Sequence, residues 1–287
     1  MTQGADRDSI IRSITDDGAF RVISARTTNT VRAITQAQEA VGGTLRALGD
    51  LVTGTILFRE MMAPEMRVQG ILRGSAGQGT IVADSHPSGK TRGLVQLPKD
   101  RPEFVLENGT ILQLMRSLPS GRINQGLVQL PEAGTVADGF MVYLETSEQV
   151  TSMLALGTLV EEGEVVAAGG YLVQLLPEVG RGPLMLMTER LNEFRTIDHL
   201  LEGEGFTPER LLEEILYGLP NTVVGGGEVR SECWCSHVRL VSALSTLNRK
   251  EIEELTADGK VLEITCDYCG REYGVTPAQL QGLLQQS

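Results

Sequence analysis

Short runs of alternating apolar and polar residues, separated by turn signals, dominate the first 180 residues of the chain. Alternation with a period of two is typical of strands that bury one face, and closely spaced runs of this kind indicate hairpins. We therefore predict an antiparallel, hairpin-rich sheet. Its strands fall at the start of residues 19–31 and within 66–72, 79–86, 91–97, 103–108, 123–130, 152–162 and 164–178.

The glycine-rich segment 74–79 joins two of these runs. It lacks the Gly-Lys-Ser/Thr end of a nucleotide-binding loop, and it links two strands rather than a strand and a helix. We interpret it as a hairpin turn.

Helical spacing replaces the alternation in two stretches, residues 29–62 and 135–150. The pair Gly42-Gly43 predicts that the first stretch divides into two helices, because glycine is unfavourable in a helix interior. Strands and helices together predict an α+β domain over residues 1–180, with a hairpin-rich sheet and helices.

The pattern changes over residues 181–231, where narrow apolar stripes recur at helical spacing. The stripes consist of Leu191, Phe194, Ile197 and Leu201, and of Leu211, Leu212, Ile215 and Leu216. Thr207 is placed to cap the second helix and Pro208 to open it. Such short helices need a neighbour to remain folded, so we predict a helical linker. We predict a hinge at Gly225–Gly227, and a passive connector remains the simpler interpretation of the whole segment.

Residues 232–287 form a small C-terminal domain in this interpretation. Residues 238–247 predict a helix, and Asn248 with Glu251 resembles a capping box for the next one, which stops near Gly259. Residues 260–275 predict two strands around a cysteine-rich turn, and Thr276-Pro277 begins a last helix. A unit of this size has little core of its own, so an additional cross-link is expected.

All four cysteines of the chain lie in this small domain, as Cys233-x-Cys235 and Cys266-x-x-Cys269. Two cysteine pairs that meet in space supply the tetrahedral four-thiolate set that zinc prefers, so we predict one bound Zn²⁺. An iron–sulfur cluster also takes four thiolates, but its usual spacings differ. His237 is close in sequence and is expected to face solvent or to support the site without binding the metal.

A purely structural zinc is the simplest interpretation of this motif. Two features favour a reactive site instead. Zinc keeps gathered thiols deprotonated and shielded until an oxidant arrives, and each pair is close enough in sequence to form a local disulfide. Loss of the metal would remove about 10–16 kcal/mol from a unit that has little else to replace it, so oxidation is expected to unfold the domain.

Charge and composition narrow the range of functions. The chain has 25 basic and 37 acidic residues and a formal net charge of −12, which disfavours a broad surface for nucleic acid. Its apolar runs are shorter than a membrane span, and its first residues do not resemble a signal peptide. We therefore expect a cytoplasmic protein that does not interact with membranes.

The cysteine motif and its surroundings resemble the redox-regulated heat-shock chaperones of the thirty-three-kilodalton class. The resemblance is most specific over the two cysteine pairs and the segment 247–270 between and around them. It extends more weakly to residues 48–58, 121–130, 146–150 and 167–178. One departure follows Cys235, where Ser236-His237-Val238-Arg239 replaces the usual charged context, and this affects the expected oxidation threshold.

The resemblance implies an ATP-independent holdase that is an inactive or weakly active monomer while reduced and zinc-bound. Oxidation in such proteins forms disulfides between near neighbours, here Cys233–Cys235 and Cys266–Cys269, and zinc is released. The C-terminal domain and the linker then unfold, the protein forms a homodimer, and it binds unfolding client proteins. By position and periodicity, the stripe residues Leu191 to Ile215 belong to the segment that unfolds and are candidates for client binding.

Two other classes of function compete with this one. A zinc-ribbon module that binds nucleic acid or a partner protein through a purely structural zinc is the main alternative. An enzyme is not expected, because the chain has only three histidines and no recognisable catalytic arrangement. The segment Asp84–His86 is interpreted as a polar loop.

Overall fold

The computed structural model describes residues 7–118, 120–177, 180–203, 205–257 and 259–284. The chain divides into two compact units, Met1–Glu232 and Cys233–Ser287. Residues 181–231, which we predicted as a separate linker, lie within the first unit. The apolar stripes within them are buried against one of its sheets, and this burial joins the segment to the preceding domain.

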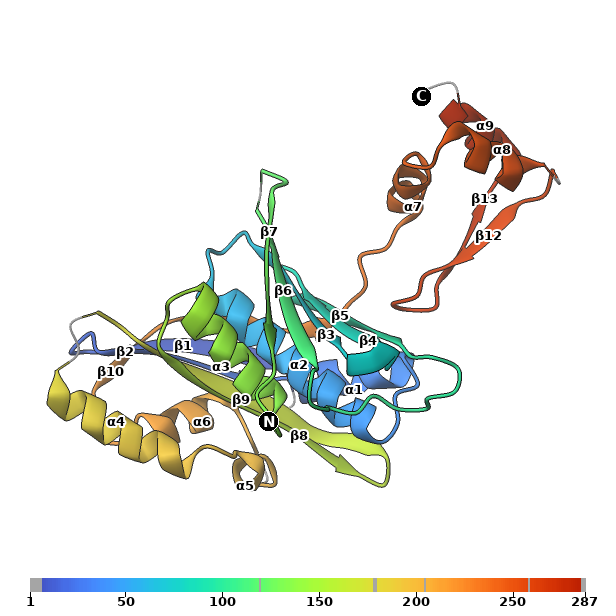
Figure 1. Ribbon diagram of the computed structural model, residues 1–287. Coiled ribbons are helices and arrows are strands. Elements are labelled where there is room, and N and C mark those ends of the chain that lie inside the picture. Colours follow the sequence, from blue (N-terminus) through green and yellow to red (C-terminus); the bar gives the residue numbers. More distant parts are fainter. Residues whose placement is uncertain (1–6, 119, 178–179, 204, 258, 285–287) are drawn as a thin grey trace, which may run out of the picture. The chain divides into compact units, whose positions relative to one another are not determined.

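The first unit contains two sheets (Figure 1). The five-stranded sheet is antiparallel throughout, and its strands are, in order, β10 (Asn221–Glu228), β1 (Ser9–Thr15), β2 (Phe20–Arg26), β9 (Glu164–Leu175) and β8 (Ser152–Glu161). The six-stranded sheet has the order β11 (Arg230–Ser231), β5 (Lys90–Gln96), β4 (Thr80–Ser85), β3 (Arg67–Arg73), β6 (Ile111–Ser117) and β7 (Ile123–Gln129). Only β11 pairs in parallel, with β5.

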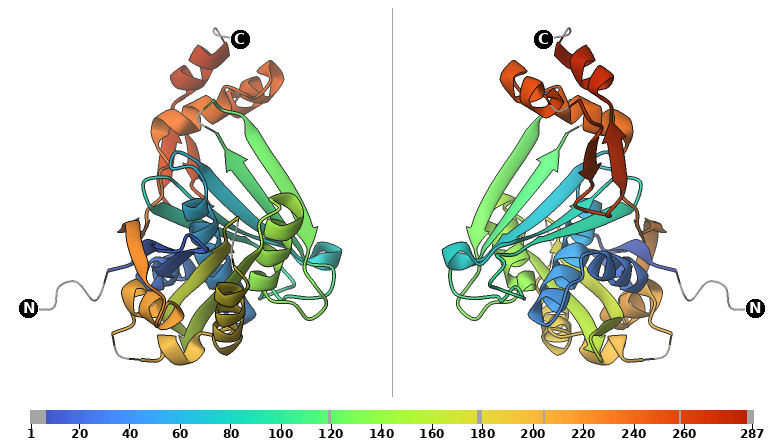
Figure 2. Two further views of the ribbon diagram at one scale, coloured as in Figure 1. Left: turned by 90° about the vertical axis from the view of Figure 1, so that its left-hand side faces the viewer. Right: turned by 90° about the vertical axis from the view of Figure 1, so that its right-hand side faces the viewer.

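Three helices accompany these sheets: α1 (Thr28–Ala37), α2 (Gly43–Met61) and α3 (Val136–Ser147). Fourteen of the nineteen residues of α2 are buried, which is expected for a helix enclosed between two sheets. The side views show α2 in that position (Figure 2). The predicted break at Gly42-Gly43 is confirmed, and the segment 74–79 is the connection from β3 to β4, as predicted.

Three short helices cover the opposite face of the five-stranded sheet: α4 (Arg181–Glu193), α5 (Asp198–Leu201) and α6 (Pro208–Ile215). The cap and opening of α6 at Thr207 and Pro208 are confirmed. The prediction that Leu191 to Leu201 form one helical face was wrong in one respect, because the helix ends at Glu193 with Phe194 as its C-cap. The Tyr171 hydroxyl donates a hydrogen bond of 2.8 Å to the Phe194 carbonyl and so helps to satisfy the helix end.

Several strands differ from the prediction. The glycine triplet is not a hinge but part of β10, because close pairing with β1 requires glycine: a Cβ on Gly226 would lie 2.6 Å from the Ile10 carbonyl oxygen. Residues 103–108 form no strand. Phe104 is buried there, and its N–H donates to the Thr44 hydroxyl instead of to a neighbouring strand. Strands β1 and β6 were not predicted.

The second unit agrees with the predicted order of elements. It contains α7 (His237–Leu244), α8 (Arg249–Thr256), β12 (Leu262–Thr265), β13 (Glu272–Val275) and α9 (Pro277–Leu284). The capping box of Asn248 and Glu251 is present. The two strands pair in antiparallel fashion on either side of the second cysteine pair, and the mixed α+β class is confirmed for the chain.

Candidate functional site

Four cysteine sulfurs meet in the second unit. The Sγ atoms of Cys233, Cys235, Cys266 and Cys269 all lie within 4.8 Å of one another. Cys233 Sγ is 3.8 Å from Cys266 Sγ, and Cys235 Sγ is 3.5 Å from Cys269 Sγ. The fold therefore brings together two pairs that are separated in the sequence by thirty residues.

Local backbone geometry positions the second pair. The turn between β12 and β13 closes when the Cys266 N–H donates to the Arg271 carbonyl, and the Cys266 carbonyl accepts from the N–H groups of Cys269 and Gly270. The backbone N–H groups of Tyr268 and Arg271 point to the sulfurs of Cys266 and Cys269. Gly270 has a φ of 68°, in the left-handed region that favours glycine, so the turn depends on that residue.

The first pair lies in the extended segment before α7. The Ser236 side chain caps this helix by accepting from the Arg239 N–H. The Nε2 atom of His237 lies 3.2 Å from the Gly274 carbonyl oxygen, and the residue is half-buried. The histidine therefore supports the connection between α7 and β13 and is not directed at the sulfurs. The residues that depart from the family pattern form the start of this helix.

The sulfur arrangement fits a tetrahedral ion. Four sulfurs at about 2.3 Å from a central zinc ion are about 3.8 Å from one another. The Sγ–Sγ separations of 3.8 and 3.5 Å match this spacing. Because four soft thiolate donors complete the shell, a zinc ion held here has no open position for water, and the site suits holding a fold together better than hydrolysis.

Without a cation, the four neighbouring thiols cannot all be deprotonated at neutral pH. Burial raises the pKa of the Cys235 thiol, but hydrogen bonds from Tyr273 and from the other thiols outweigh it and lower that pKa to about 7. Burial raises the pKa of Cys266, and it raises that of Cys269 to about 12. One thiolate therefore forms first, and its negative charge disfavours deprotonation of the other three thiols. A bound divalent cation offsets this repulsion between the thiolates and keeps the coordinating thiols deprotonated.

Tyr273 contributes a contact that the sequence did not reveal. Its hydroxyl donates a hydrogen bond of 3.1 Å to Cys235 Sγ. The residue lies on β13, and the antiparallel pairing with β12 returns it to the cysteine turn. Donors to coordinating atoms raise metal affinity, so Tyr273 is part of the site. The only signal in the sequence was its position, four residues after Cys269 on a predicted strand.

The unit around the sulfurs has a small apolar core. Among its described residues, only Ile252, Val275 and Leu280 are fully buried apolar side chains, with five partly buried leucines and Val241 around them. A core of this size rarely stabilises a fold without a cross-link. The four-thiol centre is therefore the main element available to hold the second unit together.

The seven linker residues identified from periodicity are brought together on the first unit. All are buried in one cluster, against Phe20, Val22, Ala155, Tyr171 and Val173 of the five-stranded sheet. The linker residues are Leu191, Phe194, Ile197, Leu201, Leu211, Leu212 and Ile215. The apolar stripes are thus covered by the sheet, and the sheet is covered by them.

Two glycines of the sheet allow this close approach. A Cβ on Gly157 would lie 2.5 Å from Leu201 Cδ1, and a Cβ on Gly169 would lie 2.6 Å from Phe206 Cε1. Glycine within a strand pattern often marks a place where another group approaches the backbone, and this was the available signal in the sequence. The Ser24 hydroxyl adds a hydrogen bond of 2.7 Å to the Pro208 carbonyl at the start of α6.

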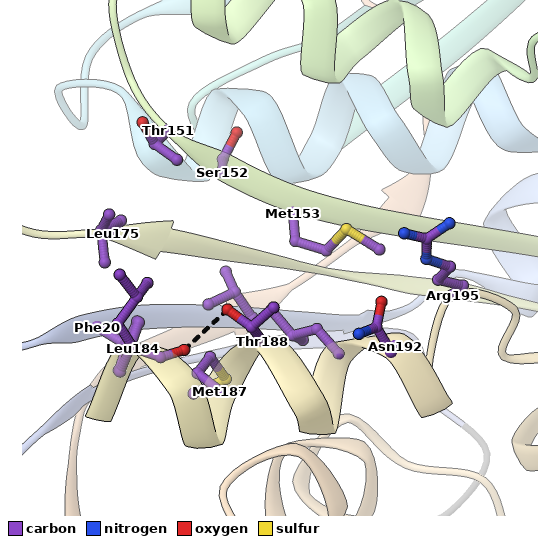
Figure 3. Close-up of a pocket in the computed structure, with 12 residues that line it drawn as sticks. Phe20, Thr151, Ser152, Met153, Leu175, Leu184, Met187, Thr188, Asn192 and Arg195 are labelled. Carbon is purple, nitrogen blue, oxygen red and sulfur yellow. Dashed lines mark hydrogen bonds between the residues drawn. The ribbon is translucent and has the colours of Figure 1, made fainter. Parts of the chain in front are cut away.

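The packing under α4 is incomplete. A groove of about 220 Å³ separates this helix from the sheet, and its walls are mostly apolar, with Asn192 and Arg195 at one end (Figure 3). The Ser152 hydroxyl is buried on the wall without a hydrogen-bond partner among the described residues. Only Met187 and Leu191 of α4 are buried. Because the groove leaves α4 with fewer van der Waals contacts to the sheet, α4 is held less firmly than α6.

One further property concerns membranes. Among the helices of the described residues, none has the length and apolar character needed to cross a bilayer.

The fold and the site define a class of proteins with an α+β core, apolar helices docked on its sheet and a C-terminal four-thiol centre. Comparison with known proteins identifies a family with these features. The family model described as Hsp33 protein matches residues 8–276. The 33 kDa chaperonins of Desulforamulus reducens and Bacillus subtilis are each 30% identical to this chain. The alignments cover 98% of this chain and 98% and 99% of those proteins.

A solved structure supports the same fold. The crystal structure of the 33 kDa chaperonin, heat shock protein 33 homologue, from Thermotoga maritima superimposes with a TM-score of 0.81 at 23% identity, over 98% of each chain. The chain belongs to the Hsp33 family of chaperones. The family resemblance inferred from the cysteine motif is confirmed.

Proposed function

We propose that this protein is a redox-regulated, ATP-independent holdase whose switch is the four-thiol centre. One observation carries the proposal: four sulfurs with zinc-like spacing lie in a unit that has only three fully buried apolar residues among those described. Such a unit depends on its metal. An event that removes the metal would unfold it, because structural zinc contributes about 10–16 kcal/mol in small domains.

The event we propose is oxidation of the four thiolates to two disulfides, Cys233–Cys235 and Cys266–Cys269. In each pair, two thiolates lose one electron each and join in one S–S bond. Hydrogen peroxide accepts the two electrons and, with two protons, leaves as two water molecules. A disulfide sulfur is a poor zinc ligand, so the Zn²⁺ held by these residues would be released. The close contact of all four sulfurs supports rapid pairing, and the choice of partners remains a prediction.

Loss of the second unit would then weaken the docked helices. The cluster residues Leu191 to Ile215 are covered by the sheet surface on which α4 to α6 lie, and the groove under α4 shows that this packing is not complete. Release of these helices would expose two apolar surfaces, the stripes and the sheet. We propose that these surfaces bind unfolding client proteins and support formation of a homodimer. Reduced thiols of this kind persist in a reducing compartment, so we expect the protein to act in the cytoplasm.

The test measures zinc, free thiols and chaperone activity in one sample. The reduced protein is assayed for bound zinc and for suppression of aggregation of a thermally unfolding client. It is then treated with hydrogen peroxide and mild heat, or with hypochlorous acid, and assayed again. The expected result is the loss of four thiols and about one zinc ion per chain, with a gain in suppression that a thiol reductant reverses.

Zinc release without a gain in suppression would contradict the proposal. The metal would then be purely structural, and the zinc-ribbon alternative would be tested next. A nucleic-acid affinity that falls with rising salt concentration would support that alternative.

A further inference from the structure

The strand β10 forms one edge of the five-stranded sheet, beside β1 (Figure 1). The two strands pair along the whole length of β10, from Thr15 opposite Asn221 to Ser9 opposite Glu228. No residue of β10 is buried. The strand is therefore held by its backbone hydrogen bonds and contributes nothing to the apolar core.

The other contacts of β10 are few and polar. The Ser13 hydroxyl donates to the Thr222 carbonyl, and the Thr222 hydroxyl donates to Asp16. Gly225, Gly226 and Gly227 give the strand low intrinsic β propensity, since glycine loses more backbone freedom than other residues. Removing β10 from the sheet would therefore expose little apolar surface that is now covered by it.

The strand that β10 covers has a different character. Ile10 of β1 is buried in the main core, and Ile11 packs on the cluster that holds α4 to α6. An edge at β1 would thus lie directly beside the apolar surface that these helices occupy. The outer edge of β10 is exposed in the resting protein, but its three glycines offer a neighbouring segment no side chains to pack against.

We propose that β10 is a removable strand, and that an extended segment of unfolded client protein takes its place on the edge of β1. This rests on the proposed function, because release of residues 181–231 is what frees the edge. A client segment would gain backbone hydrogen bonds from β1, which depend little on its sequence. Its alternate side chains would contact the apolar surface left by α4 to α6. The partner is therefore an unfolded polypeptide in extended conformation.

The test locks β10 in place in the full-length protein. Ser9 and Glu228 lie opposite each other, and facing residues are about 4.5–5.5 Å apart at Cα, within the range of a disulfide. The double variant Ser9→Cys/Glu228→Cys is closed with glutathione disulfide while the native thiols hold zinc, and mass spectrometry verifies the pairing. A matched control, Ser117→Cys/Ile123→Cys, places the same cross-link between β6 and β7 of the six-stranded sheet, which leaves the edge of β1 free to open.

Both proteins are then oxidised, and zinc release and client suppression are measured. The expected result is that both release zinc, while the protein locked at β10 needs roughly ten-fold more chaperone for half-maximal suppression than the control. Equal suppression by the two proteins would overturn the inference. Failure of the control to gain suppression would instead overturn the redox-regulated holdase function on which the inference rests.

Amide hydrogen exchange gives an independent readout in the unmodified protein, at those residues of β1 whose N–H groups bond to β10 and not to β2 on the other side. The expected result is that oxidation removes their protection and that an unfolded client restores it. Protection that survives oxidation, or that returns without client, would overturn the inference. In that case β10 of the same chain or of a second copy occupies the edge.

Discussion

Replacing Gly157 by valine tests whether docking of the linker helices restrains the chaperone. This glycine lies on β8, outside the linker and far in sequence from the cysteines. A Cβ at this position would lie 2.5 Å from Leu201 Cδ1 and 3.2 Å from both Ile197 Cγ1 and Asp198 Oδ1. All three neighbours belong to α5 or to its N-cap. Valine suits a strand, so the substitution is expected to disturb the helix rather than the sheet.

The size of the effect follows from the crowding. Inserting side-chain atoms into a packed contact costs about 1–3 kcal/mol. Because every 1.4 kcal/mol changes an equilibrium constant tenfold, the population of undocked linker should rise roughly 5- to 150-fold. The four cysteines are untouched, so the reduced variant should bind as much zinc as the parent.

Amide hydrogen exchange and client suppression of the reduced, zinc-loaded protein measure the outcome. We expect faster exchange over residues 181–215 and partial suppression without any oxidant. The change Gly182→Ala serves as control, because a Cβ at that linker position meets no atom within 4 Å. Unchanged exchange in Gly157→Val would refute the packing argument. Faster exchange without a gain in suppression would show that docking does not restrain client binding.

Three further predictions concern the metal and the half-buried carboxyl of Asp50. Tyr273→Phe removes the hydroxyl that donates to Cys235, and zinc affinity measured by competition with a chelator should fall about 10- to 100-fold, whereas His237→Gln should leave it unchanged. Removal of zinc by a chelator under reducing conditions should unfold residues 233–287 while amides of the first unit stay protected; an intact second unit would contradict its dependence on the metal. Burial raises the pKa of Asp50 from its ordinary value of 3.8 to about 6. A hydrogen bond from Thr158 lowers this pKa in part, and the negative charge of Asp198 raises it further. Since the folded state binds this proton more tightly, the carboxyl lowers stability progressively as pH rises from about 4 to 6. Asp50→Asn should therefore raise the free energy of unfolding by about 1–3 kcal/mol at pH 7 and by much less at pH 4, as measured by denaturant titration at both values.

The small second unit explains why a metal can serve as a switch. Its helices are well capped, for example by the capping box at Asn248, but caps contribute only about 1 kcal/mol each. The three fully buried apolar residues add little more. The fold of this unit is therefore coupled to its thiols, whereas the first unit, with its large core around α2, does not depend on them.

The sequence alone determined the features that depend on residue type and local spacing. Two cysteine pairs predict a four-thiol centre because the ligand chemistry resides in the residues themselves. Thr207 and Pro208 predict the start of α6 because capping involves only neighbouring residues. Alternation predicted most of the core strands, and the apolar stripes predicted which linker side chains are buried.

Tertiary structure decided the features that depend on contacts between distant parts of the chain. The glycine triplet of β10 becomes a strand only because β1, more than two hundred residues earlier, offers its edge. The linker helix ends with Phe194 as its C-cap, where Tyr171 of the sheet binds the Phe194 carbonyl, and no local residue type marks that break. Tyr273 reaches Cys235 only after β12 and β13 have paired. In each case the free energy comes from a partner that local periodicity does not contain, so only the folded chain reveals it.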